Sequence, residues 1–146
     1  MDVKEIKVIN KSNNPLPSYA TPGSAGLDIC AFLDRATTLQ PMERKLIPTG
    51  LYFSIPVGYE IQVRPRSGLA IKHGITLVNA PGTIDSDYRG ELGLLIINHS
   101  TEPYTIQPGE RIAQLILAKY SQVTWQEVDT LDATERASGG FGHTGK

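Results

Sequence analysis

Short runs in which apolar and polar residues alternate, separated by proline and glycine, restrict the fold of this chain more than any other feature. The run 59–64, Tyr-Glu-Ile-Gln-Val-Arg, predicts a strand with one buried and one wet face. No long stretch has helical periodicity, and ten prolines and fourteen glycines suit many tight connections. We therefore expect an all-β domain, built as a sandwich or barrel.

The expected strands are short and frequent. They cover residues 6–9, 27–31, 45–47, 51–55, 59–63, 75–78, 92–98, 104–106, 112–119 and 125–128. The run 92–97 is almost continuously apolar, so this strand should be buried on both faces or lie at a subunit contact. The one expected helix has one or two turns over residues 67–73 and begins at Ser67, whose hydroxyl suits an N-cap.

Length, charge and cysteine content limit the classes of function. A chain of 146 residues with 40% hydrophobic content is expected to form one domain around one core. A net charge of −1 provides no basic surface for a nucleic-acid backbone. The single cysteine, Cys30, excludes an intrachain disulfide, and three scattered histidines have no zinc-site spacing. With no membrane-length apolar run and no secretory signal, we expect a soluble, cytoplasmic protein that binds neither nucleic acid nor membrane.

The segment 82–91, Gly-Thr-Ile-Asp-Ser-Asp-Tyr-Arg-Gly-Glu, carries two carboxylates, an aromatic ring and a glycine turn between two apolar runs. Aspartate, serine and glycine form turns readily, so by itself the segment is typical of a polar hairpin tip. The same hairpin is also able to hold Asp85 beside a flat ligand.

Three other segments carry polar groups suited to an anion or a cation. Pro65-Arg66-Ser67-Gly68-Leu69 is either a turn with a cap or a small anion site made by the serine, the following N–H groups and the guanidinium. Arg111-Ile112-Ala113-Gln114-Leu115 is a strand in which Gln114 offers both a donor and an acceptor. In Ala25-Gly26-Leu27-Asp28, the carboxylate lies in an apolar run and needs a partner, such as a cation or a metal-bound water.

From about residue 131 the chain becomes polar and glycine-rich, and it contains Gly139-Gly140-Phe141-Gly142-His143-Thr144-Gly145. Such a tail is often only a flexible terminus. Its backbone N–H groups can also converge on phosphate oxygens, while Arg136 meets phosphate and Phe141 stacks on a base. We therefore expect a domain over residues 1–133 and a mobile arm over residues 134–146 that closes over a ligand.

These five segments, in their order along the chain, resemble the homotrimeric dUTP pyrophosphatases. The resemblance extends from about residue 16 to residue 145. It implies a distorted jelly-roll β-barrel of the β-clip type, assembled as a homotrimer whose three active sites each draw on all chains. It also implies Mg²⁺-assisted hydrolysis of dUTP to dUMP and pyrophosphate, by in-line attack of water on the α-phosphorus. The cellular result would be less uracil in DNA and a supply of dUMP for dTMP synthesis.

The resemblance assigns a role to each candidate site residue. Asp85 matches the carboxylate that activates the attacking water, Tyr88 the ring under the deoxyribose, and Asn79 an amide near the uracil. Asp28 matches the acid that holds Mg²⁺ through water. The phosphate binders from neighbouring chains correspond to Arg66, Ser67, Gly68 and Gln114. The closing arm corresponds to Arg136, Ser138, Gly140, Phe141 and Gly142.

Three positions depart from the family pattern. His143 stands where serine is common, Ala137 where glycine is frequent, and Thr83 where an aliphatic residue is usual. None of them removes a catalytic group.

Two other functions remain open at this point. A related fold deaminates dCTP, but the Tyr88 and Phe-Gly tail arrangement resembles the pyrophosphatases instead. A non-enzymatic regulatory module that reuses the fold is the other alternative. The joint presence of Asp85, Ser67, Gln114, Arg136 and Phe141 argues against it.

Overall fold

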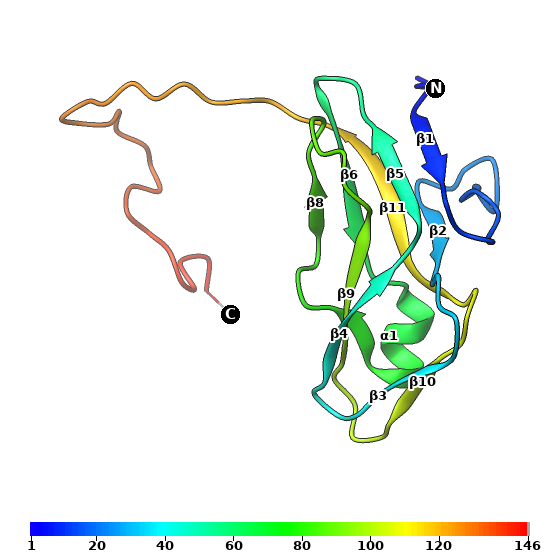
Figure 1. Ribbon diagram of the computed structural model, residues 1–146. Helices are drawn as coiled ribbons and strands as arrows, with labels where there is room; N and C mark the ends of the chain where they lie inside the picture. The colour runs from blue at the N-terminus through cyan, green and yellow to red at the C-terminus, as the bar shows by residue number, and fades with distance from the viewer. Residues whose placement is uncertain (146) are drawn as a thin grey trace.

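The computed structural model describes residues 1–145, and most of its regular structure consists of short strands (Figure 1). One short helix, α1 (Ser67–His73), follows the sixth strand. The strands are β1 (Lys7–Asn10), β2 (Leu27–Cys30), β3 (Thr37–Leu39), β4 (Arg44–Pro48), β5 (Leu51–Ser54), β6 (Tyr59–Arg64), β7 (Ile75–Leu77), β8 (Gly82–Ile84), β9 (Gly93–Asn98), β10 (Tyr104–Ile106) and β11 (Arg111–Lys119).

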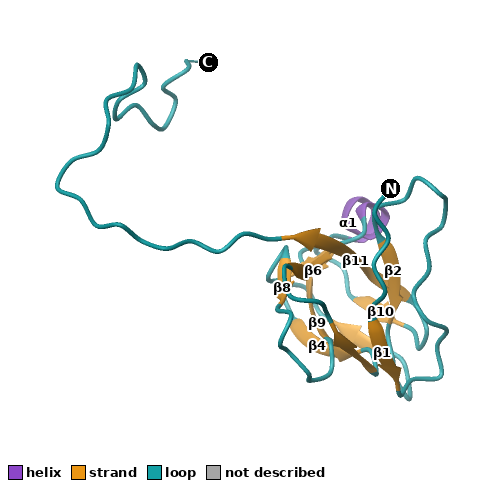
Figure 2. Ribbon diagram, turned by 90° about the horizontal axis from the view of Figure 1, so that it is seen from above, coloured by secondary structure: helices purple, strands orange, loops and turns teal. Residues whose placement is uncertain are grey.

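The strands pair in four antiparallel groups, in the orders β2-β11-β6-β8, β4-β9-β7, β1-β5 and β10-β3. Together they curve around one interior (Figure 2). Because hydrogen-bonded pairing is not continuous from group to group, the architecture is a distorted jelly roll and not a regular closed barrel. The predicted all-β fold is confirmed.

One apolar core joins the two larger sheets. Ile61 and Val63 of β6 point inward, and they pack in the same cluster as Leu94 and Ile96 of β9. The outward residues of β6 form a polar row along the strand: the Gln62 side chain donates to Glu60 (2.6 Å) and accepts from Arg64 (2.6 Å). The alternation in the sequence is therefore realised as one buried and one wet face.

The apolar strand β9 is buried along its inner face, and on its outer face Ile97 alone is buried within the described chain, at 8% exposure. Leu94 and Ile96 are fully buried, whereas Leu95 is half-buried on the outer face. Its outer neighbours are more open, with Leu46 68% and Val78 45% exposed. A single chain thus leaves an apolar patch on the outer face of the β4-β9-β7 sheet.

Two short strands were not predicted, and one predicted strand is wrong. β3 and β8 contain three residues each, and their threonine and glycine content gives little alternation to detect. The strand predicted for residues 125–128 does not form, because the described chain extends away from the barrel there and offers it no partner strand (Figure 1).

Two local predictions also need correction. The strands flanking residues 85–92 do not form a hairpin, since β8 pairs with β6 and β9 pairs with β4 and β7. The segment is instead a loop that crosses from one sheet to the other. Helix α1 has the predicted bounds, but Ser67 is its first residue; Arg66 holds the N-cap position without a capping side-chain bond.

Cys30 is partly buried, and burial raises the pKa of its thiol, which favours the neutral form. A free cysteine in such an environment behaves as a small hydrophobic residue. Over residues 1–145, no helix has both the length and the apolar character needed to cross a membrane.

Truncation of the core should destabilise the fold strongly. Leu94 is 0% exposed, so Leu94→Ala should lower the free energy of unfolding by about 2–5 kcal/mol, because it removes apolar contacts and leaves a cavity. Ile71→Ala is the control, since Ile71 is 86% exposed on α1. Urea denaturation at a fixed protein concentration measures both. Equal stability of the two variants would contradict the assigned core.

Candidate active site

The structure gathers Asp28, Arg66 and Gln114 at one end of the β2-β11-β6-β8 sheet. Arg66 Nε donates to Asp28 Oδ1 at 3.1 Å, and Arg111 Nη1 lies 3.4 Å from Asp28 Oδ2. Arg66 Nη1 also donates to the Arg111 carbonyl oxygen at 3.1 Å. The partner of the Asp28 carboxylate is therefore a pair of guanidinium groups.

Strand register explains why these residues meet. Gln114 of β11 lies opposite Asp28 of β2 on one side and opposite Arg64 of β6 on the other. Its amide nitrogen donates to the Pro65 carbonyl oxygen at 2.9 Å, just before α1. A cavity of about 390 Å³ borders these side chains. One strand thus links the acid, the amide and the segment that carries Arg66.

Gly26 belongs to this cluster, although the sequence analysis gave it no role. A Cβ at this position would overlap the Gln114 side-chain amide. Glycine therefore leaves room for the Gln114 amide in this position, and a larger residue would displace the end of that side chain. Its place two residues before Asp28 is a signal for such a contact, but the contact itself spans β2 and β11.

Ser67 and Gly68 lie exposed at the start of α1, directly after Arg66. The other end of the helix is fixed: Gly74 adopts a left-handed φ of 63°, and its N–H bonds to the Ala70 carbonyl. The predicted Arg66-Ser67-Gly68 anion site is therefore presented to solvent beside the Asp28 cluster.

The second group of predicted residues lies in the loop after β8. Asp85 and Tyr88 border one cavity of about 310 Å³, together with Glu91. Asp85 is exposed, and its carbonyl oxygen accepts from the Tyr88 N–H at 3.2 Å. The Tyr88 ring folds back over Gly90, where a Cβ would collide with the ring and its hydroxyl. Glu91 was not predicted as a site residue, and Gly90 is needed for the ring's position.

These two groups lie toward opposite ends of β6. In the β6–β8 register Ile61 faces Ile84 and Val63 faces Gly82. Extended by one residue, the same register places Asp85 near Glu60. Arg66 follows six residues after Glu60. At about 3.3 Å per residue, the two positions are separated by roughly 20 Å. One chain therefore does not bring Asp85 together with Arg66 and Ser67.

Asn79 lies close to β8, with its amide nitrogen near the position that a Gly82 Cβ would occupy (3.3 Å). It is exposed and precedes the loop that carries Asp85 and Tyr88. The structure thus places this amide beside the strand that leads into the second group.

The predicted arm is separate from both groups (Figures 1 and 2). The last backbone bond from this end of the chain to the barrel is Tyr120 N–H to the Gly58 carbonyl oxygen. Beyond it the described residues bond only locally, as in Arg136 Nε to the Gly139 carbonyl oxygen at 2.8 Å. Phe141 is fully exposed. Lys146, the last residue of the predicted arm, lies outside the described residues.

The other arm residues lie in these local turns. Gly142 has a positive φ of 84°, and Gly145 N–H bonds to its carbonyl oxygen at 2.9 Å. Ala137 also adopts a left-handed φ, of 48°, which explains why glycine is the easier residue at that position. The candidates Ser138 and Gly140 lie in the same segment and are exposed.

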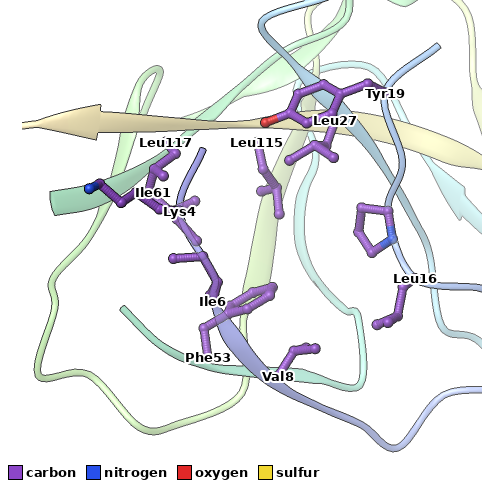
Figure 3. Close-up of a pocket in the computed structure, with 11 residues that line it drawn as sticks. Lys4, Ile6, Val8, Leu16, Tyr19, Leu27, Phe53, Ile61, Leu115 and Leu117 are labelled. Atoms are coloured by element: carbon purple, nitrogen blue, oxygen red, sulfur yellow. The ribbon is translucent and has the colours of Figure 1, made fainter. Parts of the chain in front are cut away.

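A separate apolar cavity of about 230 Å³ lies between the N-terminal segment and β11 (Figure 3). Side chains of β1, β2, β5, β6 and β11 line it, and Lys4 is its one charged lining residue. It contains none of the predicted site residues. A triphosphate requires several charged donors, and Lys4 is the one charged residue in this lining, so the two polar groups are the better candidates for the active site.

Comparison with known proteins gives a consistent result. The dUTPase family model matches residues 12–145. The deoxyuridine 5'-triphosphate nucleotidohydrolase of Finegoldia magna is 62% identical over 141 residues, which are 97% of this chain and 99% of that protein. The protein of the same name from Fusobacterium nucleatum subsp. nucleatum is 58% identical over 142 residues, 97% of each chain.

The fold comparison agrees with the sequence comparison. A solved structure of the Staphylococcus bacteriophage 80alpha dUTPase with dUPNHPP superimposes with a TM-score of 0.89 at 26% identity. The match covers 99% of this chain and 100% of that one. The chain therefore belongs to the dUTPase family, and it is a dUTP diphosphatase.

Proposed function

We propose that the chain works as a homotrimer in which Asp85 and Tyr88 of one chain act together with Arg66, Ser67, Gly68 and Gln114 of another. The proposal rests on the separation of roughly 20 Å along β6 between Asp85 and Arg66 of one chain. A triphosphate bound at Asp85 cannot use the Arg66 cluster of the same chain, so a second chain supplies it.

Exposed apolar groups support assembly. The outer face of the β4-β9-β7 sheet exposes Leu46 and Val78, and the extended segment after β11 exposes Val123, Trp125 and Leu131 by 69%, 91% and 87%. Apolar groups gathered on a surface mark interaction sites. We assign both to contacts between copies of this chain. The first of these contacts is the subunit interface expected for the apolar run 92–97.

Asp85 is the proposed general base. Its carboxylate is exposed beside the cavity shared with Tyr88, so it can take a proton from a water positioned for in-line attack on the α-phosphorus. The Tyr88 ring packs against the deoxyribose and leaves no room for a ribose 2′-hydroxyl. Asn79 and the neighbouring backbone address the uracil edge, and cytosine would leave these partners unpaired.

Arg66, Ser67, Gly68 and Gln114 hold the phosphates. Two of the five Arg66 N–H groups bond to Asp28 and the Arg111 carbonyl in the described structure, which orients the guanidinium and leaves other donors for phosphate oxygens. The arm then closes, with Arg136, Ser138, Gly140 and Gly142 at the phosphates and Phe141 over the uracil.

The residues fit a magnesium ion held mainly by the substrate. Residues 1–145 contain no cluster of three histidine, cysteine or acidic side chains that would cage a metal. Mg²⁺ commonly keeps several waters and binds through one or two carboxylates plus substrate phosphates, so Asp28 would contact it through water. When bound, the ion spreads the charge of the triphosphate and makes the α-phosphorus more electrophilic.

In the cell, this reaction would limit uracil in DNA and supply dUMP for dTMP synthesis. We place it in the cytoplasm, as expected from the sequence. Separate incubations with dUTP and dCTP test the substrate: pyrophosphate should form from dUTP, and ammonia should not form from dCTP. Ammonia release would instead support the deaminase alternative.

Replacement of the proposed base should separate binding from chemistry. Asp85→Asn keeps the shape of the side chain but removes the base, so turnover should fall about 10²–10⁴-fold while dUTP still binds. Asp87→Asn is the matched control, because Asp87 is an exposed carboxylate in the same loop. Single-turnover kinetics and calorimetry measure the two effects. Near-normal turnover in Asp85→Asn would show that another group activates the water.

Mixing two inactive variants tests the shared site. Ser67→Ala and Asp85→Asn remove groups that we assign to different chains of one site. After subunit exchange, some sites should contain both intact residues, and part of the activity should return. Mass spectrometry of isotope-labelled chains verifies the exchange. Verified exchange without any recovery would refute the shared site.

Removal of the arm should impair catalysis without unfolding the barrel. Deletion of the chain from Arg136 onward should leave the thermal midpoint nearly unchanged, because the described residues beyond Tyr120 make no hydrogen bond to the barrel. Hydrolysis should fall strongly, since the lid completes the phosphate site and excludes water. Phe141→Ala should have a milder effect, bounded by the roughly 1–3 kcal/mol of a base–aromatic stack. Full activity of the truncated protein would identify the tail as a passive terminus.

A further inference from the structure

The Tyr88 ring is held by a chain of hydrogen bonds that leads away from the substrate cavity. The Tyr88 hydroxyl donates to the main-chain oxygen of Glu91 at 2.9 Å. The Glu91 carboxylate in turn accepts the Gly50 N–H at 2.8 Å. Glu91 therefore joins the loop that carries Tyr88 to the turn between β4 and β5, forty-one positions away in the sequence.

The turn at the far end of this chain is rigid. Thr49 is 1% exposed, and its hydroxyl donates to the Leu92 carbonyl at 2.7 Å and accepts the Leu51 N–H at 3.2 Å. The Leu92 N–H donates to the Leu51 carbonyl at 2.8 Å. Buried and paired on both sides, these groups have little freedom to move. Glu91 is thus anchored to the barrel wall at its carboxylate and at the next residue.

The partner of the Glu91 carboxylate is a backbone N–H whose direction is set by the conformation of Gly50. It has a left-handed φ of 70°, and a Cβ there would lie 2.8 Å from the Ser12 backbone nitrogen. The turn is therefore fixed in a shape that aims its N–H at Glu91. A bond between a backbone N–H and a carboxylate is charge-assisted, and such bonds are stronger than neutral ones.

By contrast, the ring itself has few restraints. Tyr88 is 46% exposed and borders the cavity that also contains Asp85. Its ring hydroxyl has one hydrogen-bond partner within residues 1–145, Glu91, while its backbone N–H bonds to the Asp85 carbonyl and its backbone carbonyl accepts from Arg89 Nη1 at 3.1 Å. If residue 91 moves, the hydroxyl contact moves with it. The position of the Tyr88 ring therefore depends on Glu91.

We propose that Glu91 is a positioning residue that sets the discrimination between deoxyribonucleotide and ribonucleotide triphosphates. The inference rests on the proposed placement of Tyr88 against the deoxyribose. A ring fixed through Glu91 occupies the space that a 2′-hydroxyl would need. A ring that can tilt makes room for that hydroxyl, while the chemistry at Asp85 continues.

The test compares kcat/KM for dUTP and UTP in Glu91→Ala and Glu91→Gln. The alanine variant loses the bond to Gly50, so the dUTP/UTP ratio of kcat/KM should fall about tenfold, as expected for loss of one hydrogen bond to a charged group. The glutamine variant keeps an oxygen acceptor for the Gly50 N–H, and its ratio should stay within about threefold of the parent. Hydrogen exchange at the Gly50 amide, faster in the alanine variant alone, reports the broken bond directly.

The outcomes separate this inference from the proposed function. A parent protein that hydrolyses dUTP and UTP equally would contradict the proposed role of Tyr88. A selective parent whose ratio is unchanged in a folded Glu91→Ala variant would overturn the positioning role alone. If Glu91→Ala does not fold, Tyr88→Phe decides, because it removes the hydroxyl bond but keeps the ring and the Glu91 anchor. A reduced dUTP/UTP ratio in Tyr88→Phe supports the inference, and an unchanged ratio overturns it.

Discussion

The pairing of β11 with two neighbours at once is the constraint on which the rest of this structure depends. This nine-residue strand lies between β2 and β6, and its inward residues Ala113 and Leu115 are buried in the core. Ile112 is buried as well, at the register shift between Arg111 and Ala113. Because side chains alternate along a strand, Gln114 is forced to the outer face, opposite Asp28 and Arg64. A shift of the register by one residue would bury Gln114 and expose its apolar neighbours. The same pairing that closes the core therefore also assembles the polar cluster.

The ion pairs of that cluster serve orientation more than stability. The side chains of Asp28, Arg66 and Arg111 are 27%, 30% and 61% exposed, so water screens their attraction. Pairs of this kind typically contribute no more than about 1 kcal/mol. Their larger effect is geometric, since a guanidinium fixed at two of its donors has fewer rotamers to lose when an anion arrives. In its proposed role at the phosphates, the cluster is thus ordered before the ligand binds.

Local sequence signals predicted β6, β10 and α1 to within a residue, because alternation and turn residues mark their limits. β3 and β8 escaped detection, since three residues are too few to define a period. The segment 125–128 has strand-like composition, yet composition does not supply a partner strand. Strand formation depends on pairing, which is a property of the whole chain or of its assembly.

The candidate site was likewise predicted only in part from the sequence. Residue types and their order led to Asp28, Arg66, Asp85 and Gln114 through resemblance to a family, and the structure then brought three of these four together. Glu91 was not predicted, because its partner at Gly50 lies far away in sequence and nothing near residue 91 signals the contact. Long-range bonds from a side chain to a backbone N–H leave no periodic trace in a sequence.

Ala137 has an implication for how such arms evolve. A left-handed φ costs an alanine roughly 1–2 kcal/mol, a penalty that glycine does not have. This cost falls on a segment without hydrogen bonds to the barrel over the described residues, so it changes which shapes the arm populates and leaves the core unaffected. Under the proposed closure of the arm, exchange of alanine and glycine at this position is therefore a way for selection to adjust the closing equilibrium by about an order of magnitude, without any change in the groups proposed to touch the nucleotide.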